Sequence, residues 1–137
     1  MVEKKMSEEE LRNIIAQLQQ YQSRAEAYQQ QLALIGISIS GCENAMQVLD
    51  RLEDVKASRE MLVPIGAGSY MHATITSDRI LMGLGAGVSA EKSVDEARQS
   101  LAERKDQLSK MFERLSKDLD EIHKEMQKLQ LRASQYR

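Results

Sequence analysis

Hydrophobic residues recur at alternating spacings of three and four along two long stretches of the chain, residues 8–57 and 93–137. This spacing places the apolar side chains on one face of a helix and is typical of coiled coils. In the first stretch the a positions are Leu11, Leu18, Ala25, Leu32, Ile39 and Met46, and the d positions are Ile14, Tyr21, Tyr28, Ile35, Cys42 and Leu49. The unbroken repeat predicts one long helix over residues 8–57.

The second stretch, residues 93–137, shows the same repeat. Leu108, Leu115, Ile122, Leu129 and Tyr136 alternate with Phe112, Leu119, Met126 and Ala133, and Val94, Ala97 and Leu101 extend the apolar stripe upstream. A capping box formed by Ser93 and Glu96 predicts that this helix begins at Ser93. Two helices of similar length, joined by an insert, fold back most simply as an antiparallel coiled-coil hairpin.

One segment of the first helix departs from good helix-forming sequence. Gly36–Gly41 alternates apolar and polar residues as a strand does, and each glycine costs about 1 kcal/mol relative to alanine in a helix. The heptad nevertheless stays in phase at Ile35, Ile39 and Cys42. We therefore expect a continuous helix that is locally soft.

The insert, residues 60–92, is predicted to form short strands. Apolar or alternating runs at 61–65, 69–76, 79–84 and 88–92 are separated by turn signals at Gly66–Gly68, Ser77–Asp78 and Gly85–Gly87. Pro64 cannot donate to a strand ladder and is expected at an edge or a bulge. The predicted fold class is mostly α with a small β insert: a long antiparallel coiled-coil hairpin with two β-hairpins at the end opposite the termini, forming a single domain over residues 1–137.

Charge and apolar runs limit the classes of function. The chain has 19 Lys and Arg against 21 Asp and Glu, a net charge of −2, so the basic patch expected of a nucleic-acid-binding protein is missing. The same balance gives no reason to expect an anionic membrane as partner. We expect no signal peptide and no apolar run near the ~18 residues that span a bilayer. The single cysteine, Cys42, fits a reducing cytoplasm.

No residue pattern predicts catalysis, a cofactor or a metal. Gly83–Gly87 lacks the spacing of a phosphate-binding loop and is expected to be a turn. His72 and His123 have no companions at metal-ligand spacing and are expected on the surface. Cys42 lies on the d stripe and is interpreted as a small buried hydrophobe. Acidic residues interleaved with lysines in the second helix are expected to form a solvated face; they are Asp118, Asp120, Glu121 and Glu125.

The strands indicate assembly with other subunits, and the helix ends indicate binding of a partner at the tips of the arms. An isolated two-stranded hairpin is marginal in water and exposes unpaired edges, so pairing with strands of other subunits is expected. Several projecting arms could then combine weak contacts at their tips. The apolar residues at the tips are Met1, Val2, Met6, Leu11, Ile14, Ile15, Met126, Leu129, Leu131, Ala133 and Tyr136. Alternatively, these residues only close the coiled coil and fray at its ends.

The segments Leu62–Tyr70 and Gly83–Val88, with the glutamine-rich stretches Gln17–Ser23 and Gln29–Leu32, resemble the alpha subunits of archaeal prefoldin. The resemblance implies an ATP-independent holdase that binds non-native polypeptides at its tips and passes them to a group II chaperonin. Two alpha subunits would pair through their hairpins and seat four beta subunits in an α2β4 hexamer. The resemblance also implies a role in assembly for Val63, Ile65, Tyr70, Ile75, Ile80, Met82 and Val88, and a role in client contact for the tip residues.

Other functions remain open at this point. The same heptads fit a structural or tethering coiled coil without chaperone activity, which could assemble from copies of this chain. A nucleic-acid-binding arm would show salt-dependent RNA binding, which the near-neutral charge disfavours. A divergent gamma-type role is also compatible with the resemblance, and an enzyme is the least supported class.

Overall fold

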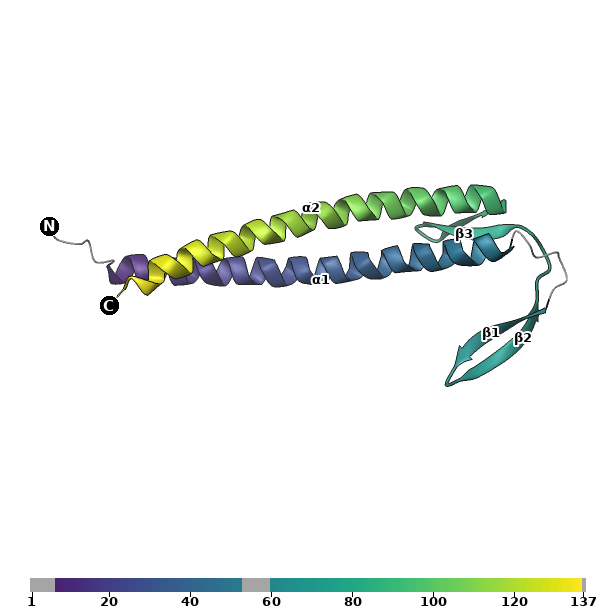
Figure 1. Cartoon of the computed structure of the whole chain (residues 1–137), viewed down its shortest axis with the longest axis horizontal. Coiled ribbons are helices and arrows are strands. Elements are labelled where there is room, and N and C mark those ends of the chain that lie inside the picture. Colours follow the sequence, from purple (N-terminus) through teal and green to yellow (C-terminus); the bar gives the residue numbers. More distant parts are fainter. Residues whose placement is uncertain (1–6, 53–59, 137) are drawn as a thin grey trace. The chain divides into compact units, whose positions relative to one another are not determined.

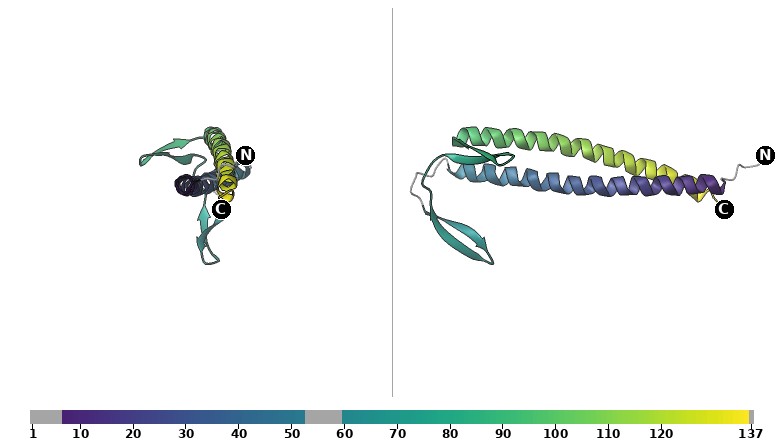
Figure 2. Two further views of the ribbon diagram at one scale, coloured as in Figure 1. Left: turned by 90° about the vertical axis from the view of Figure 1, so that its left-hand side faces the viewer. Right: turned by 180° about the vertical axis from the view of Figure 1, so that it is seen from behind.

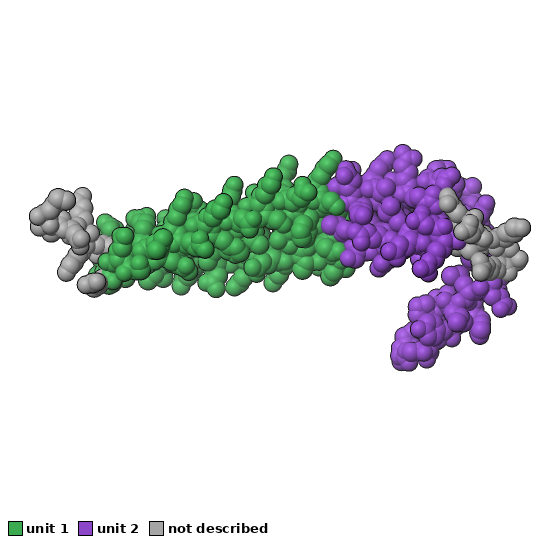
Figure 3. Space-filling view, viewed as in Figure 1, with its two compact units in different colours: residues 1–38, 108–137 green, residues 39–107 purple. Residues whose placement is uncertain are grey.

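The computed structural model describes residues 7–52 and 60–136, with the side chain of Leu52 left undescribed. The chain divides into two compact units (Figure 3). Unit 1 contains residues 1–38 and 108–137, and unit 2 contains residues 39–107. Each unit combines one segment of the first helix with one segment of the second, and the strands belong to unit 2.

The two helices are α1, Glu8–Leu52, and α2, Val94–Ser134 (Figure 1). Every a and d position of α1 is buried or half-buried, which confirms the predicted stripe. Gly36–Gly41 is helical throughout, as the heptad phase predicted, so the unbroken apolar register outweighs the low helix propensity of its glycines. Of the predicted helix over residues 8–57, residues 53–57 lie outside the described residues.

The core of unit 1 lies between the two helices. Ala25 of α1 packs with Leu119 and Ile122 of α2. The half-buried side chains around this cluster are Tyr21, Tyr28, Leu32 and Met126. The predicted stripe of α2 is buried or half-buried with one exception, Phe112, which is exposed.

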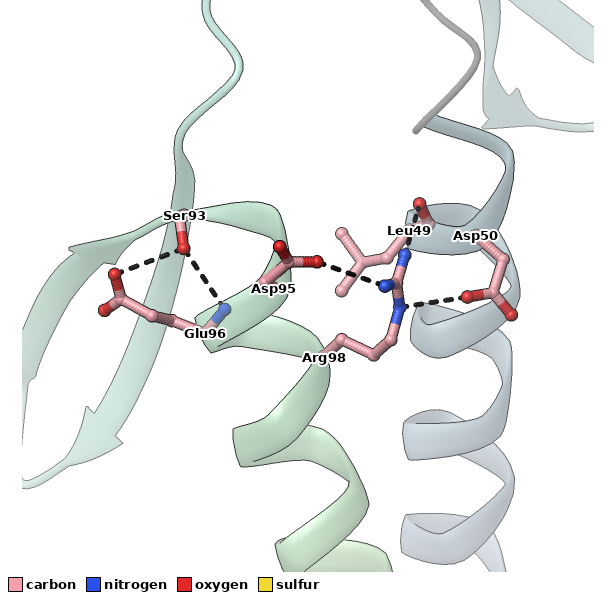
Figure 4. A network of polar contacts seen from close by, with 6 residues as sticks. All are labelled: Leu49, Asp50, Ser93, Asp95, Glu96 and Arg98. Carbon is pink, nitrogen blue, oxygen red and sulfur yellow. Dashed lines mark hydrogen bonds and ion pairs between the residues drawn. The ribbon is translucent and has the colours of Figure 1, made fainter.

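Each helix begins at a serine cap. The backbone N–H of Glu96 donates to Ser93 Oγ at 3.2 Å, and Ser93 Oγ lies 3.1 Å from Glu96 Oε1 (Figure 4). At the start of α1 the N–H of Glu10 donates to Ser7 Oγ at 3.2 Å. These bonds satisfy backbone donors that the first helical turn leaves without a partner. The predicted start of the second helix at Ser93 is therefore confirmed.

The insert forms two separate antiparallel hairpins. Strand β1, Glu60–Gly66, pairs with β2, Ser69–Thr74, and β3, Ile80–Gly85, pairs with β4, Val88–Lys92. Four short strands in this segment were predicted; the second ends two residues earlier than expected, and the third is shifted by one residue from the predicted 79–84.

The two hairpin turns have the same construction. Ala67 and Gly68 have φ angles of 52° and 71°, and Ala86 and Gly87 have φ angles of 52° and 76°. Two successive residues with positive φ are typical of the tight hairpin turns whose twist matches that of the flanking strands. The register of β1 shifts between Pro64 and Gly66, so Pro64 lies beside a bulge as predicted.

The two hairpins differ in how much of their surface is covered. In β3, Met82 is buried against the helices, and Figures 1 and 2 show this hairpin beside both of them. In β1 and β2 every residue is exposed except Ala73, which is half-buried. Among the described residues, unit 2 therefore presents one hairpin that packs against the helices and one whose residues are almost all exposed.

Candidate functional site

The described residues show no arrangement suited to metal chemistry. Within 7–52 and 60–136, no three His, Cys, Asp or Glu side chains gather as a metal site requires. His72 and His123 are exposed, as expected from the sequence. Cys42 is buried on the d stripe, where it was predicted to act as a small hydrophobe. The surfaces formed by the hairpins and the helix ends are therefore the candidates for function.

The first surface consists of the exposed apolar side chains of the hairpins. Val63, Ile65, Tyr70 and Val88 were predicted to mediate assembly, and all four are exposed. Further large apolar side chains of the hairpins are exposed that the sequence analysis did not assign: Met61, Leu62, Met71, Leu81 and Leu84. Their signal in the sequence is that consecutive residues of a strand are apolar, which makes both faces of the hairpin apolar.

Three residues of the predicted assembly set are less accessible. Ile75 and Ile80 are half-buried, and Met82 is buried inside unit 2. Met82 lines a groove of about 400 Å³ whose walls come from α1 (Ala45, Val48, Leu49), β3 (Ile80, Leu81, Met82, Gly83) and α2 (Leu101, Arg104). Met82, which was predicted to mediate assembly, therefore packs within its own chain, between β3 and the helices of unit 2.

Polar contacts also attach β3–β4 to the helical part of unit 2. The guanidinium of Arg104 donates to the carbonyl oxygen of Gly83 at 3.3 Å, and Lys92 Nζ donates to Ser100 Oγ at 2.8 Å. Arg79 forms an ion pair with Glu91 across the hairpin at 3.3 Å. These contacts fix the hairpin that precedes α2.

Two cations occupy positions of the α2 stripe where apolar residues are usual. Counting back by heptads from Phe112 gives Lys105 and Arg98. Lys105 Nζ lies 3.3 Å from Glu43 Oε1. Arg98 Nε lies 3.0 Å from Asp50 Oδ1, and its Nη2 donates to the carbonyl oxygen of Leu49 at 3.5 Å (Figure 4). The periodicity of apolar residues did not reveal these pairs.

The second surface is formed by the helix ends in unit 1. Ile14 and Leu129 are buried between the helices. The half-buried members of the predicted tip set are Leu11, Met126, Ala133 and Tyr136. Ile15 and Leu131, which lie off the heptad stripe, are 45% and 68% exposed. Met1, Val2 and Met6 lie outside the described residues. The accessible apolar surface at the described helix ends therefore centres on Ile15 and Leu131.

A polar groove of about 360 Å³ also lies in unit 1. Arg24 sits between Tyr21 and Tyr28 on α1, and the α2 side is lined by Asp118, Glu121, Ile122 and Glu125. A hydrogen bond with Tyr28 raises the pKa of Arg24, with a smaller rise from the charge of Asp118. The acidic residues are exposed, as predicted for a solvated face, and Lys128 pairs with Glu125 at 3.3 Å.

The apolar content of α1 exceeds the sequence-based expectation. The helix contains an 18-residue window with a mean hydropathy of 1.3 and few charges, so it is apolar enough to cross a membrane by length and composition. The expectation that no such stretch exists was wrong, because it considered unbroken apolar runs and not an average that includes small neutral residues. In this structure the a and d residues of α1 are buried or half-buried.

Comparison with known proteins identifies a family to which this chain is similar. The family of prefoldin subunits matches residues 21–136. The chain belongs to the prefoldin family. It is 40% identical over 96 residues to prefoldin subunit alpha of Methanosarcina barkeri, an alignment that covers 67% of each chain. It is 35% identical over 104 residues to prefoldin subunit alpha of Methanopyrus kandleri, covering 73% of this chain and 66% of the relative.

A solved structure of filamentous prefoldin from Methanocaldococcus jannaschii has the same fold. The TM-score is 0.70, with 17% identity, and the match covers 83% of this chain and 95% of that one. The fold is thus the prefoldin coiled-coil hairpin with a β insert, as the resemblance implied. Prefoldin subunits are components of chaperone assemblies, and no catalytic activity is connected with the family.

Proposed function

We propose that this chain is the alpha subunit of a cytoplasmic hetero-oligomeric prefoldin, which holds non-native polypeptides without ATP and delivers them to a group II chaperonin. The observation that carries the proposal is the division of exposed apolar surface between the hairpins of unit 2 and the helix ends of unit 1. Exposed apolar patches mark interaction sites, and we assign one of these two surfaces to assembly and the other to clients.

Assembly is assigned to the hairpins. A two-stranded sheet with no cover is marginally stable, and β1–β2 exposes Leu62, Ile65 and Tyr70 with nothing in the described chain packed over them. Pairing its edges with strands of another subunit would satisfy backbone groups and bury these side chains together. The expected partners are beta-type prefoldin subunits and a second alpha subunit in an α2β4 arrangement.

Client contact is assigned to the helix ends. The predicted tip residues supply this surface, with Ile15 and Leu131 most accessible and Ile14 and Leu129 holding the helices together beneath them. Each contact is small, so holding depends on several tips acting on one client. Met6 belongs to the proposed set on the basis of sequence alone.

The experiment combines the chain with a beta-type subunit from the same cell. Mass measured by light scattering reports assembly, and suppression of light scattering by heat-treated citrate synthase reports holding. Ile15→Gln with Leu131→Gln should keep the mass of the complex and lose most of the suppression. Leu62→Ser with Tyr70→Ser should reduce the mass. Arg12→Gln with Arg132→Gln, close to the tip pair in sequence, is the matched control and should change neither.

The second candidate is a structural or tethering coiled coil, which the continuous heptads favour. It predicts that the complex forms but suppresses no aggregation. That result with the unmodified chain would replace the chaperone proposal with the tethering one.

A further inference from the structure

The two helices of unit 1 differ sharply in surface charge. From Asn13 to Ser38, α1 carries only two charged residues, Arg24 and Glu26. The α2 segment of the same unit exposes charges on almost every turn; they are Lys110, Glu113, Arg114, Lys117, Asp118, Asp120, Glu121, Lys124, Glu125, Lys128 and Arg132. A solvated coiled-coil surface usually looks like that of α2, so the neutral side of α1 requires a separate explanation.

The neutral side contains exposed apolar residues away from the core. We define the neutral face as Ala27, Gln30, Ala33, Leu34 and Ile37, all of which are exposed. Leu34 and Ile37 are 65% and 69% exposed and lie one turn apart on the same side of the helix. Their heptad positions are c and f, so they contribute nothing to the contact between α1 and α2.

We propose that the neutral face binds extended segments of non-native polypeptides. This inference rests on the proposed function and adds a client-binding surface on the side of α1 to that of the helix ends. An unfolded segment presents apolar side chains together with backbone donors and acceptors. Leu34 and Ile37 offer apolar contact, and the Gln30 amide can both donate and accept a hydrogen bond. A face without charge accepts client segments of either sign.

The composition of the face disfavours a second copy of the chain as its occupant. Side-by-side packing of helices needs an apolar seam that repeats every 3.5 residues. A stable interface buries about 800 Å² on each partner. The neutral face has only two large apolar side chains, set among alanine and glutamine. Such a surface suits weak contacts that are repeated in several subunits.

The test uses the complex of the full chain with its beta-type partner. The probe is reduced, carboxymethylated α-lactalbumin, which stays unfolded and soluble. Leu34→Gln with Ile37→Gln should raise the dissociation constant about tenfold, since two branched apolar side chains lose their contact with the client. Lys117→Gln with Lys124→Gln, at exposed f positions of α2, is the matched control and should leave it unchanged. Glutamine forms helix at least as well as isoleucine, so melting of the helices should not fall.

Photo-crosslinking identifies the occupant. With p-benzoylphenylalanine replacing Ile37, a crosslink to the unfolded probe supports the proposal. A crosslink to another subunit in the absence of the probe, or flotation with phosphatidylcholine vesicles that Leu34→Gln with Ile37→Gln abolishes, overturns it. Unchanged affinity of the Leu34→Gln with Ile37→Gln variant for the probe also overturns the proposal for the neutral face. In that case the proposed function still stands if Ile15→Gln with Leu131→Gln weakens binding of the probe. If the unmodified complex binds no probe, the proposed function fails, and the inference fails with it.

Discussion

Replacing Arg98 tests what a cation contributes at a position of the coiled-coil stripe. Its side chain is 27% exposed, whereas the carboxylates of Asp50 and Asp95, which lie 3.0 and 3.2 Å from it, belong to side chains that are 66% and 86% exposed. The aliphatic stem is therefore largely buried, while the charges it meets are in water. We predict that packing of the stem contributes more to stability than the ion pairs do.

The magnitudes follow from this difference in exposure. A buried methylene contributes about 0.8 kcal/mol, so the mostly buried stem of Arg98 contributes roughly 1.5 kcal/mol. Ion pairs with exposed partners contribute about 0.3–0.5 kcal/mol each. Arg98→Ala should therefore lower the free energy of unfolding by about 2 kcal/mol. Arg98→Met keeps an apolar stem and loses both ion pairs, so it should cost about 0.6–1 kcal/mol, and Asp50→Asn, which weakens one pair, should cost about 0.5 kcal/mol.

The assay is equilibrium urea unfolding followed by circular dichroism, at one fixed protein concentration because assembly adds to apparent stability. A loss with Arg98→Met as large as that with Arg98→Ala would show that the charge, and not the stem, stabilises the contact. A cost above about 1.5 kcal/mol for Asp50→Asn would refute the reasoning from exposure.

The remaining predictions concern the helices and turns. Gly36→Ala with Gly41→Ala should raise the free energy of unfolding by about 1–2 kcal/mol, because both residues are helical and an added Cβ would meet no atom within 4 Å. Gly87→Ala, at φ +76°, should instead destabilise by about 1 kcal/mol, and a gain there would contradict the turn assignment. Ser93→Ala removes the cap of α2 and should lower the free energy of unfolding in urea by about 1 kcal/mol. Ser7→Ala removes the cap at the start of α1 and serves as the comparison, with a smaller loss expected.

The tip surface was partly predictable, and the part that was not has a structural reason. Ile15 and Leu131 lie off the heptad stripe, and the structure exposes both. Ile14 and Leu129 lie on the stripe and are buried, although their apolar character and position at the helix ends placed all four residues in one predicted tip set. The a and d periodicity does not single out Leu34 and Ile37, because they occupy c and f positions. The sequence feature that distinguishes them is the lack of charged residues at the outward positions around them.

The sequence by itself determined the elements of this protein. The 3-4 repeat predicted both helices. It also predicted that α1 continues through Gly36–Gly41, because a continuous apolar stripe outweighs the cost of two glycines. The paired glycines of each hairpin fixed the turns, since positive φ is readily available to few other residues.

Only the tertiary structure decided the register between the helices and which of the two hairpins packs against them. A heptad pattern is unchanged by a slip of seven residues, so it cannot select the offset between helices. The pairs Arg98–Asp50 and Lys105–Glu43, one heptad apart on each helix, fit the observed offset. The two hairpins share the same turn sequence, yet Met82 is buried while β1–β2 stays exposed, because burial depends on which surface each hairpin meets.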